Sequence, residues 1–416
     1  MNVELTKIKK TVYIVGFLLI VAAGLAVWFF TRAFVTITVS PRTARVTLDG
    51  KPLKIIAGET SINTSTGNHH LKIETDNYIG QNETVTFGRG LNQKITVTLA
   101  QTPRPVQLNS TGVFLMKGSD FNDGYYLSAN TIYKTKVGVD DKGDVNIIEN
   151  RPITEAKIND VREIIWSPTK DLALMRHSNN ISLFDFMKYD FVHQTDSAWG
   201  GNDIGSIAWS PDNSKIAYYY APASGEKSLV FANLINTEMT RVANFAELNI
   251  ENPVLRWSPD SEWLIIVPRN KDAGQNKIYL FSTYSRTIKT VTDVGDQVDA
   301  IFSPDSSHIL YNTSTGNDLP ELNLMDKDGN NKIDLKVKAN LSTVAWTKDS
   351  KSIIVALADP STKMQAIFRF DTEKVTENGF SIKDLGNIII KSIAYSDDGK
   401  LILYEANNAI YALKVS

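Results

Sequence analysis

Between positions 35 and 101, apolar residues alternate with polar residues in short runs. Threonines separate Val35, Ile37 and Val39, and a similar alternation returns at His70–Glu74 and Ile95–Leu99. A period of two indicates strands with one buried face, whereas an amphipathic helix would show a period near 3.6. This stretch holds five to six such runs and no helical period. Residues 35–101 are therefore predicted to form a small β-sandwich.

The rest of the chain repeats one pattern with a period near 45 residues. In each repeat an apolar strand ends on an aromatic residue and a hydroxyl residue, commonly followed by Pro-Asp. The hydroxyl residues stand at positions 167, 210, 258, 303, 347 and 396, with spacings of 43, 48, 45, 44 and 49. Units of this length are typical of β-propeller blades. The repeated turn is carried by Trp166, Ser167, Pro168, Trp209, Ser210, Pro211, Asp212, Trp257, Ser258, Pro259, Asp260, Phe302, Ser303, Pro304, Asp305, Trp346, Asp349, Ser396 and Asp398.

We expect these turn residues to have a structural role. Proline cannot donate a hydrogen bond to a strand, while Asp and Ser side chains can bond nearby backbone amides. The aromatic residues are then expected to pack between blades instead of stacking on a ligand.

The number of blades follows from the length of the array, which we place at residues 102–416. Positions 105–416 are 312 residues, enough for seven blades of about 45 residues. The last repeat stops after its third strand, so its outer strand has to come from elsewhere in the chain. Val106–Leu108 is placed to supply it. Seven blades are predicted; the alternative is six, with the extra N-terminal strands packed outside the ring.

The N-terminal region has a different pattern. Residues 12–30 carry no charge, three lysines precede them, and Arg32 follows them. As a helix this run would span about 28 Å, close to the hydrocarbon core of a bilayer. We expect a cytoplasmic tail at 1–10 and a single-pass transmembrane anchor at 11–34. The N-terminus is then inside the cytoplasmic membrane and the bulk of the chain is extracytoplasmic. A cleaved signal peptide is the alternative, although the run exceeds the usual signal core.

Composition and charge narrow the classes of partner. The 416 residues are 42% hydrophobic and 22% charged, with a formal net charge of −2, as in folded globular proteins. The first 34 residues hold four Lys or Arg and one Glu, which leaves 40 basic and 45 acidic side chains and a net charge of −5 in the rest. This balance argues against nucleic-acid binding. With no cysteine, the chain has no disulfide, thiol nucleophile or cysteine-bound metal, and no cofactor is expected.

The region 35–101 resembles the PEGA domain of bacterial and archaeal surface proteins. The likeness rests on Ser40–Ala44, Val46, Asp49–Gly50, Gly67, Asn77–Tyr78 and the closing strand to Leu99. Of the family's four-letter motif Pro41 and Ala44 are kept, while Arg42-Thr43 replace Glu-Gly. The resemblance implies an extracytoplasmic spacer or adhesion-like domain without catalytic residues.

The array from about residue 160 to the end resembles the TolB-type propeller repeats of bacterial envelope proteins, relatives of the WD-repeat class. Together the two resemblances imply a membrane-anchored bacterial envelope protein. They indicate the fold and do not select a function, because propellers serve binding proteins, proteases and lyases alike.

One run looks like the start of an EF-hand calcium loop. Asp326, Asp328 and Asn330 hold positions 1, 3 and 5 of such a loop. Asn331 stands where Gly is expected and Val337 where Glu is expected. We therefore favour an Asp-Gly hairpin between the third and fourth strands of a blade over a metal site.

The pair His69-His70 is a weaker metal candidate. Neighbouring side chains of a strand point to opposite faces, so one ion cannot readily use both. We expect these histidines to be solvent-exposed or to flank a turn.

The sequence contains no catalytic motif: no G-x-S-x-G, P-loop, G-x-G-x-x-G after a strand, or H-E-x-x-H. We expect a non-catalytic binding or scaffold protein that presents its propeller to an envelope protein, peptide or glycan. Candidate binding loops lie around Ala221–Lys227, Arg269–Asn276 and Thr313–Asp318. The alternative is an enzyme acting on polysaccharide or peptide, for which distant carboxylates would meet in the propeller channel. A sensor signalling through Met1–Lys10 ranks last, because this tail is short.

Overall fold

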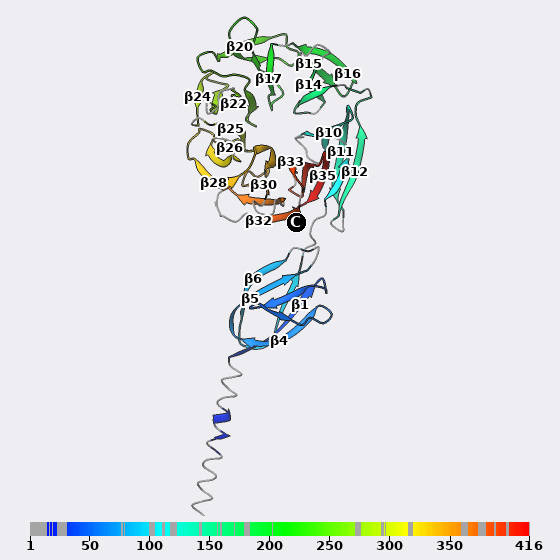
Figure 1. The fold of residues 1–416 in the computed structure, drawn as a ribbon, viewed down its shortest axis with the longest axis vertical. Coiled ribbons are helices and arrows are strands. Elements are labelled where there is room, and N and C mark those ends of the chain that lie inside the picture. The colour runs from blue at the N-terminus through cyan, green and yellow to red at the C-terminus, as the bar shows by residue number, and fades with distance from the viewer. Residues whose placement is uncertain are drawn as a thin grey trace, which may run out of the picture. The chain divides into compact units, whose positions relative to one another are not determined.

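The described elements of the computed structural model are strands, apart from the short 3-10 helix η1(Leu341–Thr343) and helical positions between 15 and 22 (Figure 1). The chain divides into two compact units, Met1–Thr102 and Pro103–Ser416. The structure describes residues 15, 17–18, 20–22, 31–75, 78, 80–99, 105–109, 113–116, 123–140, 144–155, 157–158, 160–169, 171–178, 184–201, 203–270, 276–292, 295, 297–314, 319–358, 365–372, 380–386, 388–396 and 399–415.

The transmembrane helix expected over residues 11–34 is not supported by the structure. Within the described residues, no helix has both the length and the apolar character needed to cross a membrane, which takes about 20 consecutive apolar residues. Most of the uncharged run, and all of the expected cytoplasmic tail at 1–10, lie outside the described residues. The predicted location in the cytoplasmic membrane, with the N-terminus inside, depended on that helix and is corrected with it.

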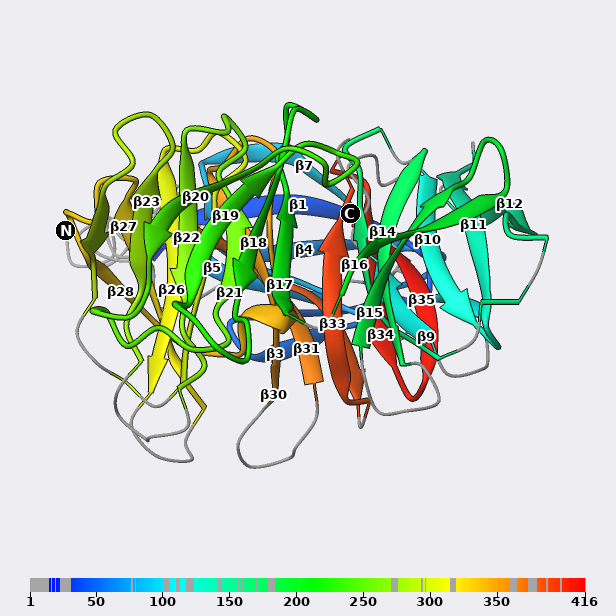
Figure 2. The ribbon, with the colours of Figure 1, turned by 90° about the horizontal axis from the view of Figure 1, so that it is seen from above.

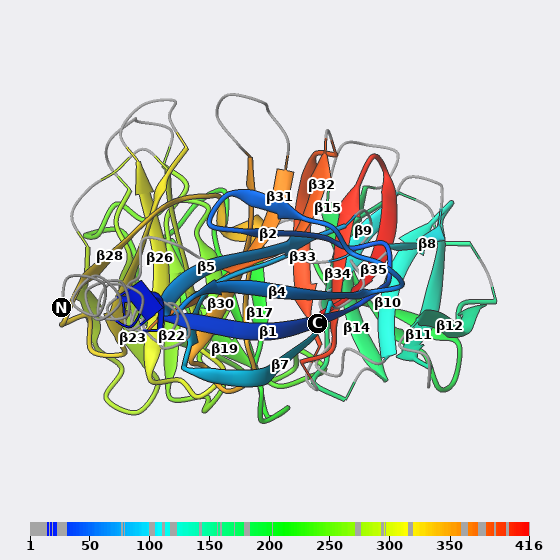
Figure 3. The same ribbon diagram turned by 90° about the horizontal axis from the view of Figure 1, so that it is seen from below.

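The first unit contains two sheets whose buried side chains form one core. One sheet has the order β4-β1-β7, with β1 in the centre, and the other the order β3-β2-β5-β6 (Figure 3). The strands are β1(Arg32–Ser40), β2(Arg45–Leu48), β3(Lys51–Leu53), β4(Glu59–Ser65), β5(Gly67–Glu74), β6(Gln81–Phe87) and β7(Gly90–Thr98).

The alternation read from the sequence sets the faces of this sandwich. Val35, Ile37 and Val39 of β1 are at most 3% exposed, while the threonines between them are half-buried. The seven described strands exceed the five to six predicted, because β4 is largely polar and shows no apolar alternation. Residues 32–34, which we had placed with the anchor, begin β1.

Among the described residues, the second unit is a ring of seven four-stranded antiparallel sheets, numbered here as blades 1 to 7 (Figure 1). Blade 1 is β9(Val113–Met116), β10(Asp123–Ser128), β11(Thr131–Val139) and β12(Val145–Pro152); blade 2 is β13(Val161–Trp166), β14(Leu172–Ser178), β15(Phe184–Asp190) and β16(Thr195–Gly200); blade 3 is β17(Ile204–Trp209), β18(Ile216–Tyr220), β19(Ser228–Ala232) and β20(Met239–Asn244); blade 4 is β21(Val254–Trp257), β22(Trp263–Val267), β23(Tyr279–Ser282) and β24(Ile288–Thr290). Blade 5 is β25(Gln297–Phe302), β26(His308–Ser314), β27(Glu321–Asp326) and β28(Ile333–Lys338); blade 6 is β29(Val344–Trp346), β30(Ser352–Ala358), β31(Gln365–Asp371) and β32(Phe380–Gly386); blade 7 is β33(Ile390–Tyr395), β34(Leu401–Ala406), β35(Ala409–Lys414) and β8(Val106–Asn109).

Blade 7 closes the ring with a strand from the start of the unit. β8 pairs antiparallel with β35, with Gln107 opposite Tyr411 and Val106 opposite Ala412. The predicted closure by Val106–Leu108 is confirmed, and so is the prediction of seven sheets. The six-bladed alternative is wrong, because β9–β12 form a complete four-stranded sheet of their own.

The second strand of blade 4 is apolar because neighbouring blades cover both of its faces (Figure 2). In blade 4, Leu264–Val267 are all 0% exposed. Leu264 and Ile266 pack into a cluster shared with blade 3, whereas Ile265 and Val267 pack into a cluster shared with blade 5. Each blade is thus fixed by two neighbours, which gives the connecting loops a rigid base.

The connections between strands fall on two rims of the ring. We call the "loop rim" the one that carries the connections between second and third strands and those between blades. The "motif rim" carries the repeated turns between first and second strands and the hairpins between third and fourth strands. The alternation follows from the antiparallel order within every blade.

Candidate functional site

The hydroxyl residue of each repeated turn holds the turn together. In blade 4, Ser258 Oγ donates to Asp260 Oδ1 at 2.5 Å and accepts a bond from the backbone N–H of Trp263 at 2.9 Å. The same pair of bonds is formed by Ser210, Ser303 and Thr347 with their own turns. These side chains therefore satisfy backbone groups and are not free to bind a ligand.

Two turns depart from this pattern. In blade 2, Ser167 donates to Asp171 at 3.0 Å, because Thr169 stands at the place of the usual Asp. In blade 7, Ser396 accepts from the N–H of Leu401 at 2.8 Å, and Asp398 lies outside the described residues.

The motif aromatics pack against the preceding blade. The indole N–H of Trp257 donates to the carbonyl oxygen of Ala208 at 3.0 Å, and its ring lies 5.3 Å from that of Phe231. The other motif aromatics have the same placement: Trp166 against Tyr125, Trp209 beside Trp199, Phe302 with Ile265 and Trp346 with the cluster of Leu322 and Leu324. These contacts place the motif aromatics between neighbouring blades.

A further hydrogen bond joins consecutive turns from blade 3 to blade 6. The fourth residue of each turn has a left-handed backbone, with φ of 63° at Ser261, 61° at Ser306 and 59° at Ser350. Its hydroxyl accepts a bond from the N–H of the motif Asp in the preceding blade. The three bonds are Asp212 to Ser261 at 3.3 Å, Asp260 to Ser306 at 3.0 Å and Asp305 to Ser350 at 3.1 Å. Sequence reasoning missed this link, although the serines recur at a fixed offset.

The calcium candidates lie in the hairpin between β27 and β28. Asp326 Oδ1 accepts bonds from the N–H groups of Asp328 and Asn330 at 3.1 and 2.8 Å, and Asp326 Oδ2 accepts from the Asn331 side chain at 3.0 Å. The carboxylate thus caps the turn of the hairpin. Over the described residues, no group of three or more His, Asp and Glu is arranged to hold a metal ion.

The two adjacent histidines of β5 have different environments. His69 is 7% exposed, stacks on Phe87 and shares a hydrogen bond of 2.7 Å with Asp49, while His70 is exposed. The bonds from His69 and from the N–H of His70 lower the pKa of Asp49. His69 is therefore not solvent-exposed; it is buried beside turns, bonded to Asp49 and to the carbonyl oxygen of Ser65.

A cluster of paired charges joins the innermost strands of blades 4 and 5. Arg256 of β21 donates hydrogen bonds to both carboxylate oxygens of Asp299 in β25, at 2.5 and 3.1 Å. Arg269 lies 3.5 Å from the same carboxylate. Burial lowers the pKa of Arg269, against the charge of Asp299, which raises it. This cluster links blades 4 and 5.

The loop rim of blades 3 and 4 is tied together by side chains. Lys227, at the end of the loop Ala221–Lys227, forms an ion pair with Glu251, which raises the pKa of the lysine. The N–H of Glu251 donates to Asn270 Oδ1 at 3.0 Å, in the loop of blade 4. Two of the three predicted binding loops are thus neighbours with a fixed separation. Residues 271–275 and 315–318, in the second and third of these loops, lie outside the described residues.

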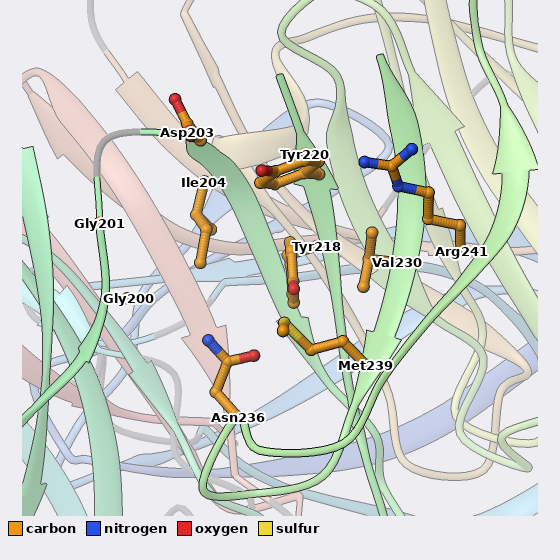
Figure 4. Close-up of a pocket in the computed structure, with 10 residues that line it drawn as sticks. All are labelled: Gly200, Gly201, Asp203, Ile204, Tyr218, Tyr220, Val230, Asn236, Met239 and Arg241. Carbon is orange, nitrogen blue, oxygen red and sulfur yellow. The ribbon is translucent and has the colours of Figure 1, made fainter. Parts of the chain in front are cut away.

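A pocket of about 420 Å³ lies on the face of blade 3 that looks toward β16 of blade 2 (Figure 4). Its floor is Tyr218 of β18, Val230 of β19 and Ile204 of β17; Tyr218 lies opposite Val230, and Ile204 lies opposite Tyr220. Met239 of β20 closes one side and is 60% exposed. A volume in this range is typical of sites for small ligands or short segments.

Polar groups surround that apolar floor. The Arg241 guanidinium lies over the ring of Tyr220, 5.4 Å from its centroid, and Asp203 lies on the opposite side of the pocket (Figure 4). Asn236 donates from Nδ2 to the carbonyl oxygen of Trp199 at 3.0 Å, which joins blades 2 and 3. Burial raises the pKa of Tyr218 to about 12, so its hydroxyl stays protonated at neutral pH.

Comparison with known proteins places this architecture in a family. A family model described as the TolB beta propeller domain matches residues 181–411, more than half of the chain. The chain belongs to the TolB β-propeller family. A model of the PEGA domain matches residues 33–103, so a PEGA domain precedes the TolB propeller. No curated protein matched the chain.

Several solved structures share the fold of the TolB propeller described here. An oligogalacturonate lyase from Vibrio parahaemolyticus is 10% identical with a TM-score of 0.53, over 75% of this chain and 93% of the lyase. An oligogalacturonate lyase in complex with manganese is 12% identical with a TM-score of 0.51, over 76% and 93% of the two chains. A chain of the Kuenenia stuttgartiensis hydrazine synthase is 12% identical with a TM-score of 0.50, over 75% and 97%. Identities this low show a common fold alone.

Sequence reasoning did not find the pocket of this TolB propeller. The run Tyr218, Tyr219 and Tyr220 ends the strand β18. Because successive side chains of a strand alternate, Tyr218 and Tyr220 share the pocket face while Tyr219 packs toward blade 4. The only sign of the pocket in the sequence was the run of three consecutive tyrosines within one buried strand.

Proposed function

We propose that the chain is a non-catalytic binding and scaffold protein whose TolB propeller holds a protein partner on its loop rim. In this proposal the PEGA domain serves as a spacer. A TolB-like propeller joined to a PEGA domain fits a binding role in general. The identity of a protein partner, and the absence of catalysis, are our proposal.

The proposal rests on the side-chain interactions that connect neighbouring loops on the loop rim. The Lys227–Glu251 ion pair and the bond from Glu251 to Asn270 hold the loops of blades 3 and 4 at a fixed separation. Loops that are ordered before binding lose less conformational entropy when a partner docks. Within the loop of blade 3, exposed residues such as Ser224 are available to contact a partner.

The test is affinity capture with the full-length protein as bait in cells that produce it naturally. Ser224→Arg adds a charged, bulky side chain to the loop rim. Ser285→Arg is the matched control, because Ser285 is an exposed serine in a hairpin of the motif rim. We expect a partner whose recovery falls at least fivefold with Ser224→Arg and is unchanged with Ser285→Arg.

The enzyme alternative is tested on the same preparations. The lyases with which the chain shares a fold are the reason to test it. If it is correct, the protein should cleave at least one member of a panel of oligosaccharides and peptides. Turnover by the full-length protein, together with partner capture that neither variant changes, would overturn the scaffold proposal. Capture that responds only to the loop-rim variant, with no turnover, would support it.

A further inference from the structure

The pocket of blade 3 holds polar groups that the described part of the chain leaves unsatisfied. Asn236 Oδ1 is a buried acceptor with no hydrogen-bond partner among the described residues. The Tyr218 hydroxyl likewise makes no hydrogen bond, and Arg241 no ion pair, within the described residues. A buried acceptor without a partner costs about 1–3 kcal/mol, so such groups commonly serve a ligand.

Charge and shape restrict the ligand. Arg241 offers a planar cation with donors suited to a carboxylate, and its guanidinium lies over the ring of Tyr220. The apolar floor of Ile204, Val230 and Met239 lies beside this cation. The ligand is therefore expected to carry a carboxylate next to an apolar side chain.

A sugar acid fits this pocket less well than a peptide. Sugar rings bind by stacking on an open aromatic face. Arg241 lies over one face of the Tyr220 ring, and Tyr218 is 1% exposed, with edge contacts to Trp199 and Tyr220. In contrast, Arg241 can pair with a terminal carboxylate, and Tyr218 can donate to a peptide carbonyl.

We propose that this pocket binds the carboxyl-terminal end of a peptide or protein, with the terminal carboxylate on Arg241 and an apolar last side chain against Ile204, Val230 and Met239. The inference rests on the proposed binding function and adds to it a second contact, in a pocket that borders the loop of Ser224 through Asp203 and Tyr220, and a chemical class for what enters it. The exposed side chain of Met239 is unbranched and flexible, so it can adapt to different aliphatic ends.

The experiment uses full-length protein and fluorescent alanine-based pentapeptides that end in Leu, made as the free acid and as the amide. Binding is followed by fluorescence anisotropy. We expect the free acid to bind at least tenfold more tightly than the amide, since the amide cannot pair with the guanidinium. A pentapeptide ending in Asp should bind at least tenfold more weakly than the Leu acid, because its side chain would meet the apolar floor.

Three variants separate the pocket from general effects on the fold. Arg241→Gln should remove the difference between acid and amide, and Met239→Asp should weaken the acid at least tenfold. Arg286→Gln is the matched control, because Arg286 is an exposed arginine in a hairpin of blade 4. It should leave both affinities unchanged. Thermal denaturation of each variant checks that the propeller is folded.

Several results would overturn the inference. They are equal binding of acid and amide, no effect of Arg241→Gln in a folded variant, and no binding of any peptide at millimolar concentration. Tighter, Arg241-dependent binding of a glucuronic acid oligosaccharide would assign the pocket to a glycan. If Ser224→Arg still lowers partner capture, the loop-rim proposal holds even when one of these results overturns the pocket proposal. Failure of the pocket proposal can therefore be distinguished from failure of the loop-rim proposal.

Discussion

Single carboxylates of the repeated turns are held charged by their surroundings. Burial raises the pKa of Asp305, but bonds from Ser303 and from the N–H and hydroxyl of Ser307 outweigh it. The net effect places the pKa at about 2, below the ordinary value of 3.8. The bonds that shape the turn therefore also couple folding to the ionisation of this side chain.

The pH dependence of stability follows from this shift. Because the folded state prefers the charged carboxylate, Asp305 stabilises the fold above pH 3.8, and this contribution is lost as the pH falls toward 2. We expect Asp305→Asn to lower the urea denaturation midpoint at pH 6, with a gap to the natural protein that narrows below pH 4. A gap of equal size at pH 6 and at pH 2.5 would contradict the assignment.

At the scale of elements, neighbouring blades are joined by one recurring bond between their turns. The hydroxyl of Ser306 accepts a hydrogen bond from the N–H of Asp260 in the preceding blade, and Ser306 is 3% exposed. The same serine adopts a φ of 61°, which costs a residue with a side chain more than it costs glycine. Bonding and backbone strain therefore act in opposite directions at one position.

Two substitutions at this position separate the two effects. Ser306→Ala removes the acceptor and keeps the strain, so it should lower the free energy of unfolding by about 1 kcal/mol. Ser306→Gly also removes the acceptor but relieves the strain, so its effect should be smaller. The measurement is urea denaturation followed by tryptophan fluorescence. A larger loss for Gly than for Ala would contradict the strain at this position, and no loss for Ala would show that the hydrogen bond contributes little.

The elements that could be predicted from sequence are those whose pattern repeats. The Ser-Pro-Asp turns recur with a fixed period, because every blade packs between two neighbours in the same way. From that period the seven sheets and the closure by Val106–Leu108 could be predicted. The polar strand β4 was missed, since edge position and not apolar alternation accounts for it. The pocket was missed because it joins Arg241, Asn236 and Tyr218 from different strands and a turn, and no local pattern marks that meeting.

At the scale of the whole molecule, the ring is closed by hydrogen bonds between its two chain ends. Leu108 of β8 is 6% exposed and belongs to a core cluster with Ile410 and Ala412 of β35. Blade 7 would otherwise end on the exposed edge of β35. The integrity of the propeller therefore depends on a single four-residue strand.

A charge at Leu108 should open this closure. Burial of an unpaired carboxylate is costly, so Leu108→Asp is expected to destabilise blade 7 by about 3 kcal/mol or more. Hydrogen exchange should show loss of amide protection in β35 first. Leu48→Asp, in the core of the sandwich, is the control and should leave exchange in β35 unchanged. Equal loss of protection in all blades of Leu108→Asp would contradict a local role for β8.

The closure also sets an order of events during synthesis. A ribosome makes Val106–Asn109 well before Ala409–Lys414, with about 300 residues between the two strands whose ends must be brought together. Until the last strand leaves the exit tunnel, β8 has no partner in blade 7, and its amides must be satisfied by water or by a chaperone. Translation of the last strand of the propeller therefore decides when the first strand of the propeller joins a sheet.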